Sequence, residues 1–116
     1  MDLAPKTLPR APPYEGDPEA LIKLCSAEGS GDVEACRALI ARGIDIDERD
    51  DECEFTALMW AAIYGHTEVV RELVRAGAAL DLQDKWQNTA LMLAARWDRT
   101  EVVREMVMVL ILLDLM

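Results

Sequence analysis

The sequence lacks most of the side chains from which catalytic and metal sites are built. It contains a single histidine, His66, and three cysteines, none of which forms a CxxC pair. An activated nucleophile needs a base that a third group orients, and a structural zinc site needs closely spaced Cys or His ligands. No glycine-rich phosphate loop is present either. We therefore expect a protein that is not an enzyme and that holds no metal, nucleotide or other cofactor.

Basic residues are scarce relative to acidic ones: 12 Lys and Arg stand against 22 Asp and Glu, for a net charge of -10. Because nucleic acids are bound through clusters of Lys and Arg on their phosphates, we expect no nucleic-acid partner. An odd number of cysteines without close pairing favours a reducing compartment, the cytoplasm or alternatively the nucleus. The start has no signal-peptide pattern, and the apolar last eleven residues are too short for a transmembrane segment.

Four of the five prolines lie between residues 5 and 13 and disfavour helix there. We therefore expect residues 1–16 to be a flexible, extended, proline-rich segment. Asp17 can then cap a helix whose first position is Pro18, where the missing N–H costs nothing. This helix is predicted to end at about Glu28, before a Gly-Ser-Gly stretch.

Three more helices are predicted in the middle of the chain, over Val33–Ala41, Ala57–Tyr64 and Thr67–Arg75. The third carries valines and leucines at the spacing of one helical face. Gly43 and Gly77 end the first and third of these helices, as glycine commonly does just past a last turn. Helix pairs this short cannot bury an apolar face alone, so similar units should flank the central pair.

The chain repeats itself with a period of 34 and then 33 residues. The segment TALM at 56–59 recurs at 89–92, and TEVVRE at 67–72 recurs at 100–105. The first copy aligns with the second through matched Leu, Ala, Gly, Glu and Arg residues. A period of this length, with two helices in each copy, is typical of a stacked solenoid.

These residues resemble the ankyrin repeat, whose pattern runs Asp-x-x-Gly-x-Thr-Pro-Leu-His-x-Ala-Ala, then Gly-His, a Val-Val-x-x-Leu-Leu helix and Gly-Ala-Asp. The resemblance covers residues 18–116. It implies an all-α ankyrin-repeat domain over 17–116, with stacked repeats at about 17–49, 50–83 and 84–116. It also implies a non-catalytic protein–protein interaction module, although fold-level analogy names no partner.

Several positions depart from the family pattern. Ala57 and Ala90 replace proline, and Met59 and Met92 replace the histidine that accepts a hydrogen bond from threonine. We expect apolar packing of the flexible methionines to take the place of that bond. Neither finger-like loop has the turn glycine, and the stretch from Asp50 to Thr56 has one residue more than that from Asp84 to Thr89, so we expect an irregular finger there. His66 stands at the Gly-His position and should serve local capping and packing.

The third copy has an atypical apolar end: Leu110 replaces the closing glycine, and Ile111, Leu112 and Leu113 follow where a polar turn belongs. A terminal repeat normally presents a polar outer face. Two interpretations stay open. The chain could be a regulatory or targeting fragment of a larger protein, even an enzyme, with further repeats or domains beyond Met116. Alternatively, the apolar C-terminal helix covers its surface by self-association or by docking.

Seven carboxylates lie between residues 45 and 54. They do not fit a calcium-binding loop, since Asp50 stands where glycine is required and Thr56 where glutamate closes the loop. The segment is either a solvated acidic loop or an acidic docking surface for a basic partner. Cys53 lies in it, and we expect its negative neighbours to raise its pKa. The other two cysteines align with core positions.

The aromatic residues indicate where a partner would bind. Ankyrin repeats hold partners with their fingers and the exposed side of each first helix, and all aromatic residues except Tyr14 map there. Some of them, Trp60 above all, could instead pack between repeats. We expect the concave face to bind a protein segment with apolar anchors and positive charge. This face comprises Glu52, Glu54, Phe55, Trp60, Ile63, Tyr64, Lys85, Trp86, Asn88, Arg96 and Trp97.

Overall fold

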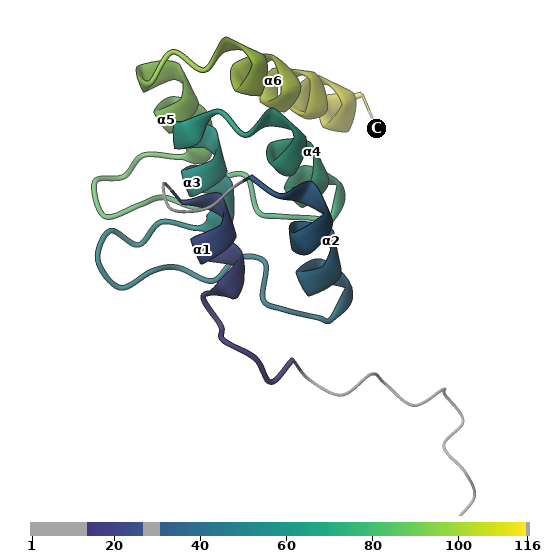
Figure 1. Ribbon diagram of the computed structural model, residues 1–116. Coiled ribbons are helices and arrows are strands. Elements are labelled where there is room, and N and C mark those ends of the chain that lie inside the picture. The colour runs from purple at the N-terminus through teal and green to yellow at the C-terminus, as the bar shows by residue number, and fades with distance from the viewer. Residues whose placement is uncertain (1–13, 27–30, 116) are drawn as a thin grey trace, which may run out of the picture.

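The computed structural model of the chain describes residues 14–26 and 31–115. These residues form six α-helices and no strand, which confirms the predicted all-α class. The helices are arranged as three pairs that stack side by side (Figure 1). Most of the proline-rich segment expected over residues 1–16 lies outside the described part of the chain.

The pairs are α1 with α2, α3 with α4, and α5 with α6. Their bounds are α1 Ala20–Cys25, α2 Val33–Ala41, α3 Ala57–Tyr64, α4 Thr67–Arg75, α5 Ala90–Arg96 and α6 Thr100–Asp114. The predicted bounds of α2, α3 and α4 are confirmed. The start of α1 was predicted two residues too early, because the Asp17 side chain accepts a hydrogen bond from the Glu19 backbone N–H (2.9 Å) and holds these residues in a turn. The predicted end near Glu28 lies outside the described residues.

Threonine caps start the first helix of the second and third pairs. The Thr56 hydroxyl accepts a hydrogen bond from the Met59 N–H (3.2 Å), and Thr89 does the same for Met92 (3.3 Å). Met92 is 51% exposed, so the expected apolar packing of the methionines is wrong for this residue. Met59 is buried, as expected, and its sulfur also accepts a hydrogen bond from the Thr56 N–H (3.5 Å). The Met59 sulfur thus provides a weak hydrogen bond in place of the threonine–histidine bond of the family pattern.

The core runs along the stack between the pairs. α3 lies between α1 and α5, while α4 lies between α2 and α6 (Figure 1). Small residues such as Ala61, Ala62 and Ala94 are fully buried and allow the first helices to approach closely. Leu58 and Leu73 are also buried, and each such side chain contributes roughly 1.5–3 kcal/mol of hydrophobic stabilisation.

The two cysteines expected in the core are there. Cys25 and Cys36 are completely buried. The hydrogen bond with the Cys36 thiol, followed by burial, raises the pKa of Cys25. Both side chains therefore act as packing groups, and Cys53 is the cysteine that solvent can reach.

A row of ion pairs crosses from each second helix to the next. Arg37 on α2 pairs with Glu72 on α4 (3.0 Å), and Arg71 on α4 pairs with Glu105 on α6 (2.8 Å). These arginines lower the pKa of both glutamates, chiefly through the hydrogen bonds they donate. We call these pairs the arginine–glutamate row. It links neighbouring repeats in register on the side of the second helices.

α6 is longer than its counterparts, with 15 residues against nine in α2 and α4. Gly77 ends α4 by adopting a left-handed conformation (φ 94°) that other residues rarely take. Leu110 occupies the same position in the third copy and continues the helix instead. The large side chains from Leu110 to Leu113 are exposed. None of the helices in the described residues is long and apolar enough to cross a membrane.

Candidate protein-binding face

The two finger loops are each built around one aspartate. The Asp50 carboxylate accepts hydrogen bonds from the backbone N–H groups of Cys53 (2.9 Å) and Phe55 (3.2 Å). In the next finger, Asp84 accepts from the N–H groups of Trp86 and Asn88, both at 2.8 Å. A carboxylate thus organises each turn even without the glycine of the family pattern. The first finger keeps its extra residue, because Asp50 bonds the third and fifth residues after it where Asp84 bonds the second and fourth.

The missing glycines are replaced by residues in a left-handed backbone conformation. Glu54 has a φ of 61° and Gln87 a φ of 71°. Such a conformation costs a non-glycine residue on the order of 1 kcal/mol, which the aspartate hydrogen bonds offset. The fingers are also joined, since the Lys85 N–H donates to the Cys53 carbonyl (3.0 Å). They lie side by side on the left of Figure 1.

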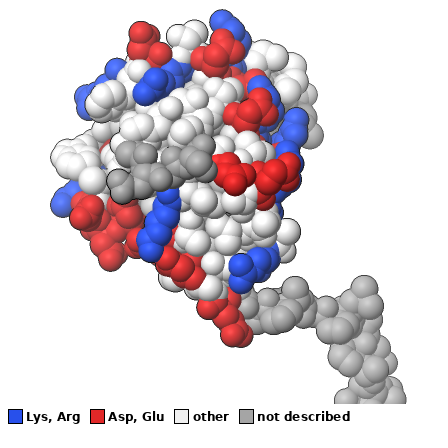
Figure 2. All heavy atoms as spheres, viewed as in Figure 1, with Lys and Arg blue, Asp and Glu red and all other residues white. Residues whose placement is uncertain are grey.

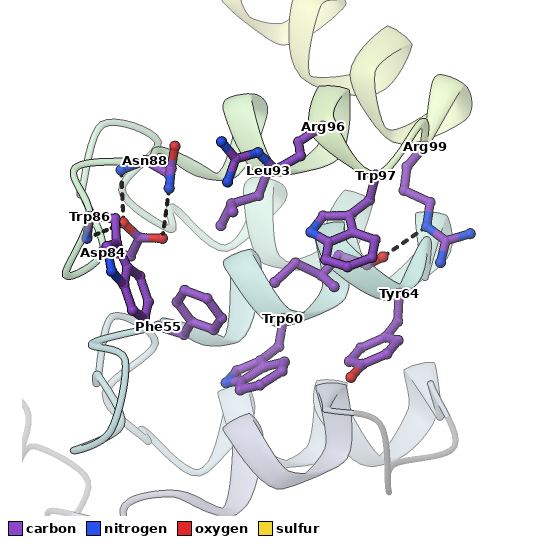
Figure 3. A pocket seen from close by; sticks show the side chains of 11 residues that line it. Phe55, Trp60, Tyr64, Asp84, Trp86, Asn88, Leu93, Arg96, Trp97 and Arg99 are labelled. Atoms are coloured by element: carbon purple, nitrogen blue, oxygen red, sulfur yellow. Dashed lines mark hydrogen bonds between the residues drawn. The ribbon is translucent and has the colours of Figure 1, made fainter.

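A pocket of about 550 Å³ opens between the fingers and the first helices α3 and α5 (Figure 3). Eight of the eleven residues predicted for the binding face line it. Glu52, Glu54 and Lys85 do not, and remain exposed on the fingers. The complete lining is Phe55, Trp60, Ile63, Tyr64, Asp84, Trp86, Asn88, Leu93, Arg96, Trp97 and Arg99.

Aromatic rings form the walls of the pocket. Phe55 packs edge-on against Trp60 with ring centroids 4.8 Å apart, and Trp60 lies parallel to Tyr64 at 5.9 Å. The Trp60 indole N–H donates to the Asp50 carboxylate (2.9 Å), which fixes this half-buried ring in place. By contrast, Trp86 is 62% exposed and Trp97 54% exposed. The alternative of packing between repeats therefore describes Trp60 in part, but neither of the other tryptophans.

Three residues of the lining were not predicted. Leu93 lies on α5, is the counterpart of Trp60 one repeat later, and is buried. Asp84 is also buried, and it shapes the finger. Arg99 is the counterpart of His66, and its Nε donates to the Ile63 carbonyl (2.7 Å; Figure 3). Aligning each repeat with the one before would have found Leu93 through Trp60, but not Arg99, because its counterpart His66 does not line the pocket.

His66 packs between repeats and does not cap. It precedes α4 without a side-chain capping bond, so the capping expectation is wrong. A Cβ at Gly31 would lie only 2.7 Å from the His66 ring, which shows that the imidazole rests against the preceding repeat. Burial, and secondarily the Arg99 charge, lower the pKa of His66. The neutral ring therefore fits this contact.

Several carboxylates of the acidic loop have structural partners within the protein. Asp50 anchors the finger, and Asp47 accepts a hydrogen bond from the Ala79 N–H (3.0 Å). Glu54 pairs with Arg49 (3.5 Å). Acidic side chains still gather over this finger at the lower left of Figure 2. Burial, followed by nearby carboxylates, raises the pKa of Cys53, in the direction expected.

The face combines an apolar pocket with charged groups on the surrounding finger and helix. Within residues 14–26 and 31–115, no group of three His, Cys, Asp or Glu side chains is placed to hold a metal ion. The apolar walls and the ordered fingers can instead enclose a side chain of a partner, while the charged groups at the rim can orient it.

Comparison with known proteins identifies the family. No curated protein sequence matches the chain at a significant level. The family model for ankyrin repeats matches residues 22–111 and recognises three copies. This span includes both fingers and all six helices, apart from the start of α1 and the end of α6. The chain therefore belongs to the ankyrin repeat family.

Proposed function

We propose that the protein is a non-catalytic interaction module whose concave face binds a segment of a partner protein. Ankyrin repeats are generally protein–protein interaction modules, which supports the general class. The observation that carries the specific proposal is the aromatic pocket of about 550 Å³ between the fingers and the first helices. An apolar side chain of the partner enters this pocket and anchors the segment.

The exposed tryptophans support an apolar anchor. Trp86 and Trp97 stand on opposite sides of the pocket, on a finger and at the end of α5 (Figure 3). Large aromatic side chains are enriched among the residues that dominate interface energies, where one anchor can contribute 2 kcal/mol or more. Closing them over a partner side chain would remove apolar surface from water at both places.

The charges at the rim support a basic segment next to the anchor. Asp51 and Glu52 are exposed at the tip of the acidic finger, close to the pocket wall that Phe55 provides. Positive side chains beside the anchor would lie against these carboxylates, which speeds association and sets orientation. Arg96 lines the side of the pocket formed by α5. The partner segment therefore runs with its basic end toward the fingers.

The three free thiols support a reducing compartment, the cytoplasm or the nucleus, as the place where this interaction occurs. The two core cysteines contribute packing that a disulfide would alter.

A displayed library of random peptides tests the proposal, since it needs no known partner. Selected peptides are expected to combine one large apolar residue with nearby Lys or Arg, and to bind less tightly as salt is raised. Trp97→Ala and Tyr64→Ala should each weaken binding about tenfold or more, as expected for central aromatic contacts. Binding should also shift the tryptophan fluorescence.

Met108→Ala is the matched control, because Met108 is as exposed as Trp97 (both 54%) but lies on α6, away from the pocket. Circular dichroism and thermal melting of all three variants show whether the fold is intact. Peptides that bind the Trp97 and Tyr64 variants as well as the unmodified chain, or that are uniformly acidic, would contradict the proposal.

A further inference from the structure

The end of the stack formed by α5 and α6 is an uncovered repeat interface. Met59 is 1% exposed because the third pair covers it, whereas its counterpart Met92 is 51% exposed. Ala62 is likewise buried and its counterpart Ala95 exposed. Residues that pack against a neighbouring repeat in the middle of the stack thus meet solvent at its end.

On α6 this surface continues as an apolar stripe. Val103, Val107, Leu110 and Ile111 follow the i, i+4, i+7, i+8 spacing of one helical face. Val102 and Met106 point the other way and are buried. We call the uncovered surface the end face, made of Met92, Ala95, Val103, Val107, Leu110 and Ile111.

The arginine–glutamate row also ends at this face, where Arg104 donates to no carboxylate of another repeat among the described residues. Arg37 and Arg71 each bond a glutamate three residues earlier on their own helix and another on the next repeat. Arg104, the next arginine in the row, pairs only with its own Glu101 (2.6 Å) among the described residues. The end face therefore combines an apolar stripe with an arginine whose earlier counterparts each meet a carboxylate across the interface.

α6 does not end where the other second helices do. After α2 and α4, Gly43 (φ 88°) and Gly77 (φ 94°) turn the chain away into the next loop. At Leu110 the helix continues, so that α6 reaches a length of about 22 Å. It runs straight past the end of α4 (Figure 1). Among the described residues, the apolar stripe therefore extends along the whole of this longer helix.

The opposite end of the stack is not complementary to the end face. The position in α2 that corresponds to Glu72 is Ala38, so the first repeat offers no carboxylate to an arginine placed against it. Exposed charged residues, including Glu34 and Arg42, lie along that helix and at its end. Head-to-tail stacking of two copies would leave Arg104 without a carboxylate.

A second copy of the chain can cover the end face with its own end face and can supply a carboxylate for Arg104. The last nine described residues of α6 and its cap, 107–115, contain one charge, Asp114, which has no ion-pair partner among the described residues. When two copies of a helix cross antiparallel, a residue that lies before the crossing point in one copy faces the residue that lies equally far after it in the other copy. A crossing near Val109 places Arg104 of one copy beside Asp114 of the other.

We propose that the end face is a homodimer interface, in which two copies associate tail to tail through antiparallel α6 helices. The two-fold axis places the apolar stripes in contact and forms the Arg104–Asp114 pair twice. The interface closes on itself, so the product is a dimer and not a filament. The concave faces of both copies stay open, and the dimer would present two peptide-binding pockets.

Size-exclusion chromatography with light scattering tests the proposal on the full chain. The expected mass is twice the 12.9 kDa of the chain at high micromolar concentration, falling toward 12.9 kDa on dilution. Ile111→Glu should raise the dimer dissociation constant roughly a hundredfold, because it places a charge in the apolar contact. Leu112→Glu is the matched control: it lies on the same helix with similar exposure (55% against 51% for Ile111), but on the side of α6 away from the stripe, and should leave the dissociation constant nearly unchanged.

A charge exchange tests the register of the two helices. Arg104→Asp and Asp114→Arg should each weaken the dimer about tenfold, and the double variant should recover most of the loss. Circular dichroism checks that every variant folds. A chain that is monomeric at all concentrations, equal effects of Ile111→Glu and Leu112→Glu, or no recovery in the double variant would each overturn the proposal. Peptide binding at the concave face would be unaffected by any of these results.

Discussion

The central and third repeats share most of their sequence but not their environment. Both begin with the same TALM segment and continue with the same TEVVRE segment. Met59 nevertheless lies in the core, whereas Met92 lies half in solvent. The comparison teaches that the role of a residue in a stack depends on which neighbours its repeat has, because a repeat contacts only the units beside it.

The same two repeats also end differently, and here the cause is in the sequence. Gly77 allows the left-handed turn that ends α4, while Leu110 favours the continuation of α6 to Asp114. Leu110, together with the apolar residues that follow it, thus continues the helix where the central repeat makes a turn.

The largest expected difference in the free energy of unfolding is between variants of the two equivalent methionines. Met59→Ala should lower the free energy of unfolding by about 2–5 kcal/mol, since it leaves a cavity and removes the sulfur that bonds the Thr56 N–H. Met92→Ala should change it by no more than about 0.5 kcal/mol. Urea unfolding measures both, in chains that also carry Ile111→Glu so that association makes no contribution. Equal losses would mean that the end face is covered within the monomer.

Exchanging the residues at the ends of the second helices should have an intermediate effect. Gly77→Ala is expected to cost about 1–2 kcal/mol, because the residue must adopt a φ of 94°. No atom lies near the added Cβ, so the cost comes from the backbone alone. Leu110→Ala keeps a good helix former in place and serves as the control, in chains that also carry Ile111→Glu so that association makes no contribution. Urea unfolding that shows no loss for Gly77→Ala would refute this account of how α4 ends.

A smaller and opposite effect is expected in the second finger. Gln87→Gly should stabilise the protein by about 0.5–1 kcal/mol, since glycine adopts the φ of 71° without strain but is more flexible when unfolded. Lys85→Gly, in the same finger without a left-handed backbone, should be neutral or slightly destabilising. Thermal melting measures the difference between the two variants. A lower melting temperature for Gln87→Gly would show that the aspartate alone determines the turn.

The smallest effect concerns the arginine–glutamate row and depends on pH. Arg71 holds the pKa of Glu105 below its ordinary value of 4.5, so this pair stabilises the fold above that pH and stops doing so as the pH falls. Arg71→Ala should therefore lower the melting temperature near neutral pH but not in strong acid. Arg104→Ala removes no contact between repeats and should have little effect at either pH, when both variants also carry Ile111→Glu so that association makes no contribution. An equal loss for both arginines would show that the row does not couple the repeats.

Much of the fold could be predicted from local sequence. The bounds of α2, α3 and α4 follow from apolar spacing, from caps such as Thr56, and from glycines such as Gly77. The start of α1 could not, because the Asp17 side chain stabilises a competing turn. The ordered turns of the fingers could not be predicted either, since a carboxylate can organise a turn in place of glycine and no local sequence pattern indicates when it does.

For the candidate site, the repeat alignment located most of the pocket lining but not the exposure of each ring. Trp60 and Trp97 both belong to first helices or their ends, yet the Asp50 carboxylate holds only Trp60 in a fixed, half-buried position. Glu52, Glu54 and Lys85 were placed on the same face, and they lie on the finger surface outside the pocket. Which side chains converge on one cavity depends on how the fingers fold onto the helices.

The sequence by itself determined the repeat, its period, the helices within each copy and the family, because these depend on spacing along the chain. It also determined that the third helix pair would not end as the others do, through Leu110 in place of glycine. Only the tertiary structure decided which of two identical methionines is buried, which carboxylates hold a loop, and which aromatic rings face the pocket. These properties depend on distances between residues of different repeats, and no single segment specifies them.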